Sequence, residues 1–425
     1  MEKRIDLDNR VQELVDFTMD KWGLDNYYLH TYNFYRKLNV LNETIYTLTM
    51  EWYPSHITEQ EDEDCNPDGT AVIDLNVQNR QFESVIFVDG ETFANRRLIR
   101  SIEIDEIIKF IENETGLIHG NQFHLQSEEE NKYLFRSSIN GVAVSPSGTI
   151  EIKFNPEGKL AYFSKYGPFP SVDKELEETF CLKLEDVEQI AKNQLKLIEF
   201  PLRKQKKLVP VYCLEEIYIT NDLSKTLPFI YLGLVYTIDE RLHWHTSNKK
   251  SFKRRQMNLI ENVTAEQAFA FEPHSDLIPI TDSEKEKCIS SVKDFLSQAY
   301  PRDSGKWLLK TLHRDNGYIQ GTLRLIDQES SIMQRKLMLL IDPISFKVLN
   351  YMDNEDFLEI YNECQETESI TINLENAFER IKSTIDLKPV YVYDFEQKIY
   401  VLCGRIDSDC GINAINGDLL ELNDF

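Results

Sequence analysis

The chain has 425 residues, more than one hydrophobic core usually organises, so two or three domains are expected. Hydrophobic residues make up 41% and charged residues 28%, which is typical of a globular protein and excludes wholesale disorder. The net charge of −25 repels nucleic-acid phosphates and anionic membrane surfaces, so we expect neither as a partner.

No targeting or membrane segment is recognisable. The amino terminus, MEKRIDLDNRVQELVDF, lacks the apolar run of about 7–15 residues that a secretory signal needs. The longest mainly apolar stretch, residues 228–238, is shorter than the roughly 20 residues of a membrane helix. The sequence therefore predicts a cytoplasmic protein without membrane insertion.

The seven cysteines are scattered and include no Cys-x-x-Cys pair, which favours reduced thiols over a disulfide framework. Cys403 and Cys410 are the only close pair. They could be oxidised across a terminal hairpin, but two thiols in neighbouring strands are the more ordinary interpretation.

Five segments have the apolar periodicity of a helix that packs on one face. Ser283 and Glu286, before the fourth segment, have the spacing of a capping box. The five apolar stripes are Val11, Leu14, Val15, Thr18 and Trp22; Ile104, Ile107, Ile108 and Ile111; Val187, Ile190, Ala191, Leu195 and Ile198; Cys288, Val292, Phe295, Leu296 and Ala299; and Leu374, Ala377, Phe378, Ile381 and Ile385.

After each helical segment the apolar period changes to two and the residues become β-branched or aromatic, as in TIYTLTMEWY and RKLMLLI. The connections are too short for helical crossovers, so these strands are expected to be antiparallel. The sequence predicts an α+β protein of consecutive repeats, each a helix packed on an antiparallel β-sheet.

Each repeat is predicted to end with a β-hairpin whose turn contains an Asp or Asn. The side chain of such a residue can accept a hydrogen bond from a backbone amide two residues further on. The five turn residues are Asp89, Asn155, Asp239, Asp342 and Asn416.

The spacing of the helices suggests three domains. Two helix-plus-sheet units fall in residues 1–170, one in 171–275 and two in 276–425. The proline-rich stretches at 166–173 and 272–282 are the candidate linkers.

A helix followed by antiparallel strands and such a hairpin resembles the PepSY-type domain and, more closely, the YcdB/YcdC-like repeat proteins of spore-forming bacteria. The matching segments are VDGETF at Val88, FNPEGKLAYFS at Phe154, IDPISFKVLNY at Ile341 and INGDLLEL at Ile415. The resemblance implies a non-catalytic module, sometimes associated with inhibition or propeptide-like binding of proteases, and it supplies no catalytic residue. Related proteins are commonly exported, whereas no export signal is visible in this sequence.

Two patterns could hold a metal ion. Asp64, Asn66 and Asp68 fit the first half of a calcium loop, but Leu75 stands where a bidentate Glu is needed, and the flanks are strand-like. His243 and His245 would lie on one face of a strand, as in some zinc and copper sites, without an indicated third ligand. A solvated acidic loop and two exposed histidines are the more ordinary interpretations, so no metal is expected.

The only strong basic cluster is KKSFKRR, with Lys249, Lys250, Lys253, Arg254 and Arg255. It is the candidate site for an acidic partner. The alternative is a solvated loop whose charge balances nearby carboxylates.

The sequence contains no glycine-rich phosphate loop, G-x-S-x-G elbow or H-E-x-x-H motif. We therefore predict a non-catalytic binding or inhibitory module that acts on a protein or peptide, for instance by strand addition at a sheet edge, and needs no cofactor. One alternative is a hydrolase with an active site that sequence motifs do not reveal; a deep pocket with converging titratable groups would favour it. The other alternative is a metal-responsive protein, which would require a metal ion to bind at the loop around Asp64.

Overall fold

The computed structural model describes residues 7–57, 65–171, 178–202, 206–228, 234–245, 251–257, 261–326, 334–358 and 369–424. Within these ranges no helix combines the length and the apolar character needed to cross a membrane. The chain divides into two compact units. Unit 1 comprises Met1–Glu178, Glu261–His274 and Val390–Val401, and unit 2 comprises Thr179–Ile260, Ser275–Pro389 and Leu402–Phe425.

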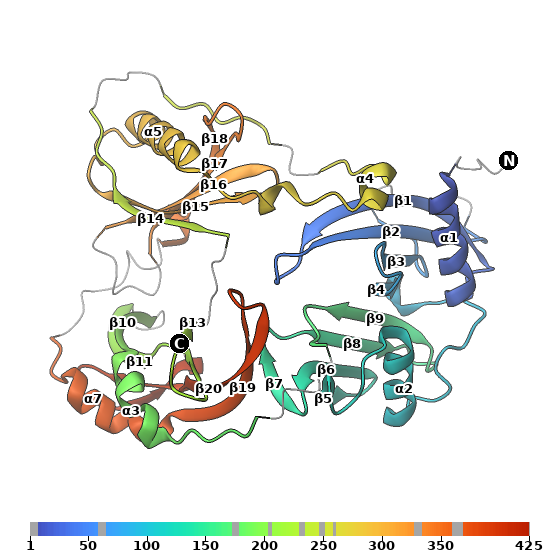
Figure 1. Ribbon diagram of the computed structural model, residues 1–425, viewed down its shortest axis with the longest axis horizontal. Coiled ribbons are helices and arrows are strands. Elements are labelled where there is room, and N and C mark those ends of the chain that lie inside the picture. Colours follow the sequence, from blue (N-terminus) through green and yellow to red (C-terminus); the bar gives the residue numbers. More distant parts are fainter. Residues whose placement is uncertain are drawn as a thin grey trace. The chain divides into compact units, whose positions relative to one another are not determined.

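Unit 1 contains two successive runs of a helix followed by antiparallel strands (Figure 1). The first run is α1 (Asn9–Trp22), β1 (Tyr27–Leu38), β2 (Thr44–Pro54), β3 (Ala71–Asn76) and β4 (Phe82–Phe87). The second is α2 (Ile104–Thr115), β5 (Phe123–Glu129), β6 (Lys132–Ile139), β7 (Val142–Ser145), β8 (Thr149–Phe154) and β9 (Leu160–Tyr166). The short helix α4 (Ala265–Ala270) also belongs to this unit.

The two runs share one sheet, in which the strands follow the order β1-β2-β3-β4-β9-β8-β6 and β5 also pairs with β6. Side chains that lie opposite one another form an apolar row across this sheet, at Met50, Ile73, Val85, Phe163, Ile152 and Tyr133. All six are at most 4% exposed. They share one core with buried side chains of α1 and α2, so both helices cover the same apolar face.

Three further runs of a helix followed by strands begin in unit 2, and residues 390–401 of the last run belong to unit 1. They begin with α3 (Leu184–Asn193), α5 (Asp282–Ala299) and α7 (Leu374–Ile381). The strands after α3 are β10 (Leu195–Leu202), β11 (Lys207–Leu214), β12 (Ile217–Thr220), β13 (Thr226–Pro228) and β14 (Tyr236–Arg241); those after α5 are β15 (Trp307–Asp315), β16 (Tyr318–Leu325), β17 (Lys336–Ile341) and β18 (Val348–Asp353); and those after α7 are β19 (Asp386–Asp394), β20 (Ile399–Asp407), β21 (Cys410–Asn413) and β22 (Leu419–Glu421).

The helices of unit 2 belong to two separate cores. The first core joins α5 to the five-stranded antiparallel sheet β14-β15-β16-β17-β18, with Phe295 and Trp307 at most 2% exposed. The second joins α3 and α7 to residues of β11, β12, β20 and β21, and α3 and α7 lie side by side (Figure 1). Strand β11 pairs with β21, and β12 pairs with β20.

The α+β fold predicted from the sequence is confirmed, and all five predicted helices are present. Some boundaries differ. Helix α3 ends at Asn193, so Leu195 and Ile198 lie in β10, where their spacing of three places them on opposite faces and in two different apolar clusters. The short helix α4 was not predicted because its six residues are too few to show periodicity.

The predicted turns at Asn155, Asp342 and Asn416 are hairpins, between β8 and β9, β17 and β18, and β21 and β22. The prediction is wrong at Asp89 and Asp239. Asp89 lies in a 3-10 turn after β4, with a left-handed φ of 56°, and β4 pairs with the distant β9. Asp239 lies inside β14, where the pairing with β15 shifts register.

Each run nevertheless contains at least one hairpin with the expected Asx turn. In the first run Asn76 follows this rule, because its Oδ1 accepts hydrogen bonds from the backbone N–H of Gln78 at 3.0 Å and of Asn79 at 3.2 Å. In the third, Asp222 accepts from the N–H of Ser224 at 3.0 Å, between β12 and β13. The turn chemistry thus recurs in all five runs, but in the first and third runs its residues are not those first assigned.

The grouping of the runs also differs from the predicted domains 1–170, 171–275 and 276–425. The middle segment shares its core with α7, and residues 261–274 belong to unit 1. Strand pairing between β11 and β21 joins segments about 200 residues apart, which local patterns cannot show. Cys403 is buried and Cys410 is partly buried, and the two are not joined in a disulfide.

The capping box of α5 is displaced from its predicted position at Ser283 and Glu286. Thr281 is the N-cap: its Oγ1 accepts from Glu284 N–H at 3.3 Å, and Glu284 Oε2 accepts from Thr281 N–H at 2.9 Å. Glu284 also forms an ion pair with Arg314 at 2.8 Å. The Thr281 hydrogen bond, assisted by Arg314, lowers the pKa of Glu284 below its usual 4.5.

Replacing Glu284 by Gln is therefore expected to destabilise the α5 run by about 1 kcal/mol near neutral pH. A carboxyl group whose folded pKa is lowered stabilises the protein above its unfolded pKa, and this contribution is lost as pH falls through the folded pKa. Urea unfolding of the wild type and Glu284→Gln should thus differ above about pH 5 and converge in acid. Glu286→Gln, on the same helix and exposed, is the control; an equal loss in both variants would contradict this cap assignment.

Candidate functional site

The predicted basic cluster lies in unit 2, and part of it can be placed. Lys249 and Lys250 lie outside the described residues, whereas Lys253, Arg254 and Arg255 are described and exposed. The sequence therefore correctly indicated exposed positive charge at these three positions.

The segment that carries these cations is fixed at both its side chains and its backbone. The ring of Phe252 packs against Phe295 and Tyr351, with ring centroids 4.8 Å and 5.8 Å away. The guanidinium of Arg254 lies 4.1 Å from the centre of the Tyr351 ring. The backbone N–H of Arg255 donates to the carbonyl of Leu349 in β18 at 2.9 Å.

A groove of about 760 Å³ lies between this segment, α5 and the start of β18, within the range of volumes that hold ligands. We call it the basic groove. Its α5 wall consists of residues with the i, i+3, i+4, i+7 spacing of one helix face. The basic groove is lined by Ser251, Phe252, Lys253 and Arg255; by Ser291, Asp294, Phe295 and Gln298 of α5; and by Lys347 and Val348.

The basic groove carries three cations, Lys253, Arg255 and Lys347, against the single carboxylate Asp294. None of the three forms an ion pair with a carboxylate in the described part of the chain. The pKa of Asp342 is lowered chiefly by hydrogen bonds from Ser345. The positive charge of Arg255 adds to this lowering without a direct ion pair. The groove is thus locally positive on a chain of net charge −25.

The remaining lining combines apolar surface with hydrogen-bonding groups. The partly exposed ring of Phe252 supplies apolar surface, whereas Phe295 and Val348 are buried and only 2% and 9% exposed. The hydroxyl oxygen of Ser291 accepts from the N–H of Val348 at 3.1 Å, which leaves its own hydrogen to donate, and the Gln298 amide has both a donor and an acceptor. This arrangement suits a ligand with acidic and apolar groups.

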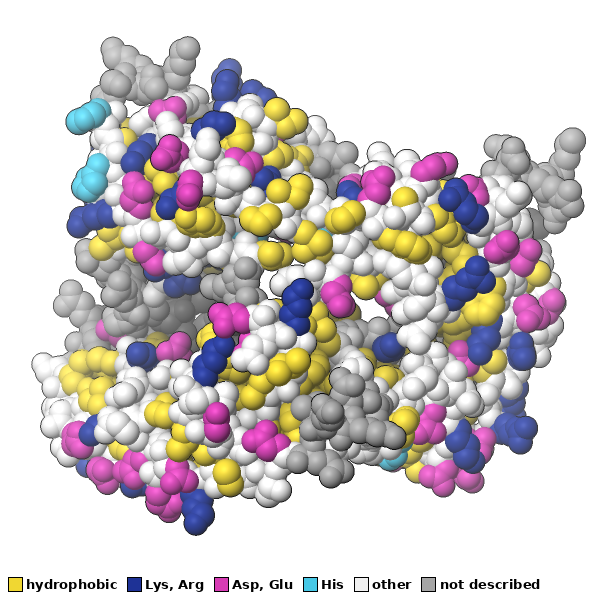
Figure 2. Space-filling view, in the orientation of Figure 1, with side chains coloured by type: hydrophobic (Ala, Val, Ile, Leu, Met, Phe, Trp, Pro, Cys, Tyr) yellow, Lys and Arg dark blue, Asp and Glu magenta, His cyan; other side chains and the backbone are white. Residues whose placement is uncertain are grey.

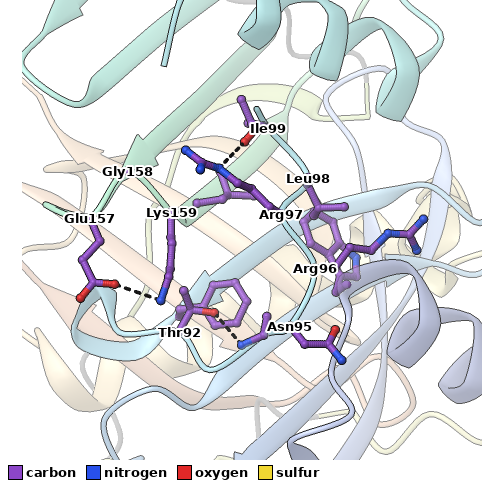
Figure 3. Close-up of a pocket in the computed structure, with 13 residues that line it drawn as sticks. Thr92, Asn95, Arg96, Arg97, Leu98, Ile99, Glu157, Gly158 and Lys159 are labelled. Atoms are coloured by element: carbon purple, nitrogen blue, oxygen red, sulfur yellow. Dashed lines mark hydrogen bonds and ion pairs between the residues drawn. The ribbon is translucent and has the colours of Figure 1, made fainter. Parts of the chain in front are cut away.

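A second pocket, of about 210 Å³, lies in unit 1 under the loop between β4 and α2 (Figure 3). This loop is held against the end of α1, where the Asn95 N–H donates to the carbonyl of Gly23 at 3.0 Å. Gly23 ends the helix with a left-handed φ of 64°, and a Cβ there would lie 2.5 Å from that of Arg96.

The charged groups around this smaller pocket are already used within the protein. Arg96 donates to the carbonyl of Asp20 at 2.9 Å, at the carboxyl end of α1, and Arg97 donates to the carbonyl of Ile99 at 3.2 Å. Lys159 pairs with Glu157 at 2.9 Å, as Figure 3 shows. These contacts fix the loop, so the pocket offers fewer unpaired charges to a ligand than the basic groove.

The predicted metal patterns are arranged differently from a metal site. Asp64 lies outside the described residues; the side-chain oxygen of Asn66 accepts from the Tyr53 hydroxyl at 3.1 Å, and Asp68 is exposed. The strand expected at His243 and His245 is wrong, because β14 ends at Arg241, and both histidines are exposed. In the described ranges there is no group of three or more His, Cys, Asp or Glu residues that could hold a metal ion.

Comparisons with known proteins give little support for any family. No protein-family model matches the chain, and no curated protein matches it. Among solved structures, the Bacillus megaterium YpeB C-terminal domain is similar over 80% of this chain and 96% of that domain, with 11% identity and a TM-score of 0.23. A TM-score this low carries no argument about fold or function, and the PepSY and YcdB/YcdC resemblance stays a prediction.

The sequence did not indicate Lys347 or the α5 wall of the groove. Lys347 follows the β17–β18 turn, nearly 100 residues after the basic cluster, and only the tertiary structure brings them together. One signal was available: Ser291, Asp294 and Gln298 are polar positions that flank the apolar stripe of α5.

Proposed function

We propose that this protein is a non-catalytic binding module whose basic groove accepts an acidic segment of a protein partner. The observation that carries the proposal is the set of three cations, Lys253, Arg255 and Lys347, that pair with no described carboxylate and surround a groove of about 760 Å³. Cations that face an open groove can pair with a partner's carboxylates and speed its association.

The lining of the groove favours binding over hydrolysis. Among the described residues that line the groove, Asp294 is the only carboxylate and there is no histidine or cysteine, so these residues lack the paired groups of general acid–base or nucleophilic catalysis. The apolar side chains of Phe252, Phe295 and Val348 favour a segment in which acidic residues are interspersed with apolar ones.

Recognition is expected to use side chains more than strand addition at β18. The segment that carries Arg255 already runs beside β18: Arg255 N–H donates to Leu349 O, and the Asn350 amide donates to Arg255 O at 3.0 Å. A partner would therefore bind over the groove, between this segment and α5.

Surface charge is distributed in a way that makes the groove selective. Acidic, basic and hydrophobic side chains are interspersed on the face shown in Figure 2. Against a net charge of −25, an acidic segment would be repelled by most of the surface and attracted where unpaired cations gather.

The test is the binding of a fluorescein-labelled peptide of alternating Glu and Leu, followed by fluorescence anisotropy. Replacing Lys253, Arg255 and Lys347 together by Gln should weaken binding by roughly tenfold or more at low salt, because three favourable charge pairs are lost. The difference between wild type and variant should shrink as salt rises.

The control variant replaces Arg100, Lys196 and Lys388 by Gln, which removes the same charge from other elements. It should bind the peptide nearly as well as the wild type. Equal weakening in both variants would show a general charge effect, and unchanged binding in the groove variant would refute the proposal.

A further inference from the structure

Lys165 of β9 is a partly buried cation that pairs with no carboxylate in the described part of the chain. Its ammonium donates to the side-chain oxygen of Gln81 at 3.1 Å and lies 5.5 Å from the centre of the Phe169 ring. It makes no ion pair with any described residue. A buried charge that is neither paired nor fully solvated costs free energy, so it needs an explanation.

The obvious counter-ion for Lys165 is already engaged. Glu83 accepts from Lys37 at 2.8 Å, from the Thr47 hydroxyl at 3.0 Å and from the Asn76 amide at 3.2 Å. Burial lowers the pKa of Lys165, and the charge of Glu83 only partly opposes this effect. Lys37 and Glu83 therefore neutralise each other, and Lys165 is left as the excess charge.

Lys165 faces a cavity that could supply its missing partner. A pocket of about 250 Å³ is lined by Lys165, Lys37 and Glu83 together with neutral amides, including those of Asn79 and Gln81. Val40 and Phe82 add apolar surface. The charged groups of the lining sum to one positive charge, two lysines against one glutamate.

We propose that this pocket is a binding site for a small monocarboxylate, whose charge completes the ion pair that Lys165 lacks. One uncompensated cation suits a singly charged ligand, whereas a phosphate dianion would leave excess negative charge beside Glu83. The amides can bind the second carboxylate oxygen, and the apolar side chains can hold a short alkyl chain. This site lies in unit 1 and does not depend on the function proposed for the basic groove.

Binding should be coupled to proton uptake. A carboxylate beside Lys165 favours its charged form and so raises its pKa, which takes up a proton wherever the empty site is partly neutral. By the same linkage, affinity for the carboxylate should fall as pH rises towards the pKa of the bound state.

The experiment is titration calorimetry of the full chain with butanoate, in buffers that differ in ionisation enthalpy, with butanamide as the uncharged comparison ligand. We expect butanoate to bind with net proton uptake in alkaline buffers in which Lys165 of the empty site is partly neutral, and butanamide to bind far more weakly. Lys165→Met, which keeps the length of the side chain, should weaken butanoate binding about tenfold or more. Lys109→Met, at an exposed ion pair on α2, is the matched control.

A second readout uses the wild type alone. The rate of Lys165 acylation by an amine-selective reagent is measured by mass spectrometry as a function of pH. The pH at which this rate is half-maximal should be lower for Lys165 than for exposed lysines, and butanoate should raise this midpoint pH. The inference is overturned if butanoate does not bind, if it binds Lys165→Met equally well, or if the acylation midpoint is unaffected. Inorganic phosphate bound more tightly than butanoate would equally refute a monocarboxylate site.

Discussion

Replacing Phe378 by Ala is expected to destabilise the core shared by α3 and α7 by about 3–5 kcal/mol. Phe378 is 1% exposed and belongs to the same cluster as Val187 and Ala191 of α3 and Ile412 of β21. Truncation to Ala removes buried apolar surface and leaves a cavity, and both effects add to the cost.

Hydrogen exchange followed by mass spectrometry is the appropriate measurement, because a chain with several cores need not unfold in one step. Protection should fall in α7 and also in α3, which lies about 190 residues earlier in the sequence. It should stay unchanged in α5 and β15–β18, which form a separate core. The control is Phe357→Ala, a residue 73% exposed, and loss of protection confined to α7 would contradict the shared core.

Replacing Arg335 by Met is expected to lower the free energy of unfolding of the α5 run by about 2–3 kcal/mol. Its guanidinium lies 3.0 Å from Asp353 and 2.6 Å from Glu355, and 5.4 Å from the centre of the Trp307 ring. The Tyr300 hydroxyl donates to the same Asp353 carboxylate at 2.7 Å. Without Arg335, the Asp353 carboxylate, whose side chain is only 13% exposed, loses its cation.

Urea unfolding monitored by tryptophan fluorescence would report this loss through Trp307. Arg324→Met is the matched control, since Arg324 is exposed and its side chain hydrogen-bonds Gln334. That variant should change stability by less than about 0.5 kcal/mol. If the two substitutions have equal effects, Arg335 does not stabilise the cluster around Asp353.

Local sequence patterns predicted the elements of the fold well. The five apolar stripes became five helices because each helix buries one face against a sheet, and that requirement is visible within about 15 residues. The Asx turns at Asn155, Asp342 and Asn416 followed from side-chain chemistry that acts over two or three residues.

Non-local pairing explains what the sequence could not show. The same Asp motif lies in a 3-10 turn at Asp89, because β4 pairs with a strand of another run. At Asp239 the motif lies inside a strand. Likewise, β11 pairs with β21, and α3 and α7 therefore pack into the same apolar core. No period in the local sequence encodes such choices.

The candidate site was predicted in part. The local cluster KKSFKRR indicated Lys253 and Arg255, because such a run of cations is conspicuous in an acidic chain. Lys347 and the α5 wall became visible only when the fold brought them to the same groove. Lys165 gave no signal, since what distinguishes it is the lack of a counter-ion in three dimensions.

The central claim, that the basic groove recognises acidic segments through Lys253, Arg255 and Lys347, is tested most directly by exchanging the charges. A variant with all three replaced by Glu is titrated with the alternating Glu and Leu peptide and with its Lys and Leu counterpart. We expect the affinity of this variant for the acidic peptide to fall, and its affinity for the basic peptide to exceed that of the wild type, each by at least about tenfold at low salt. If the variant still binds the acidic peptide with wild-type affinity, the groove is not the recognition site and the account is wrong.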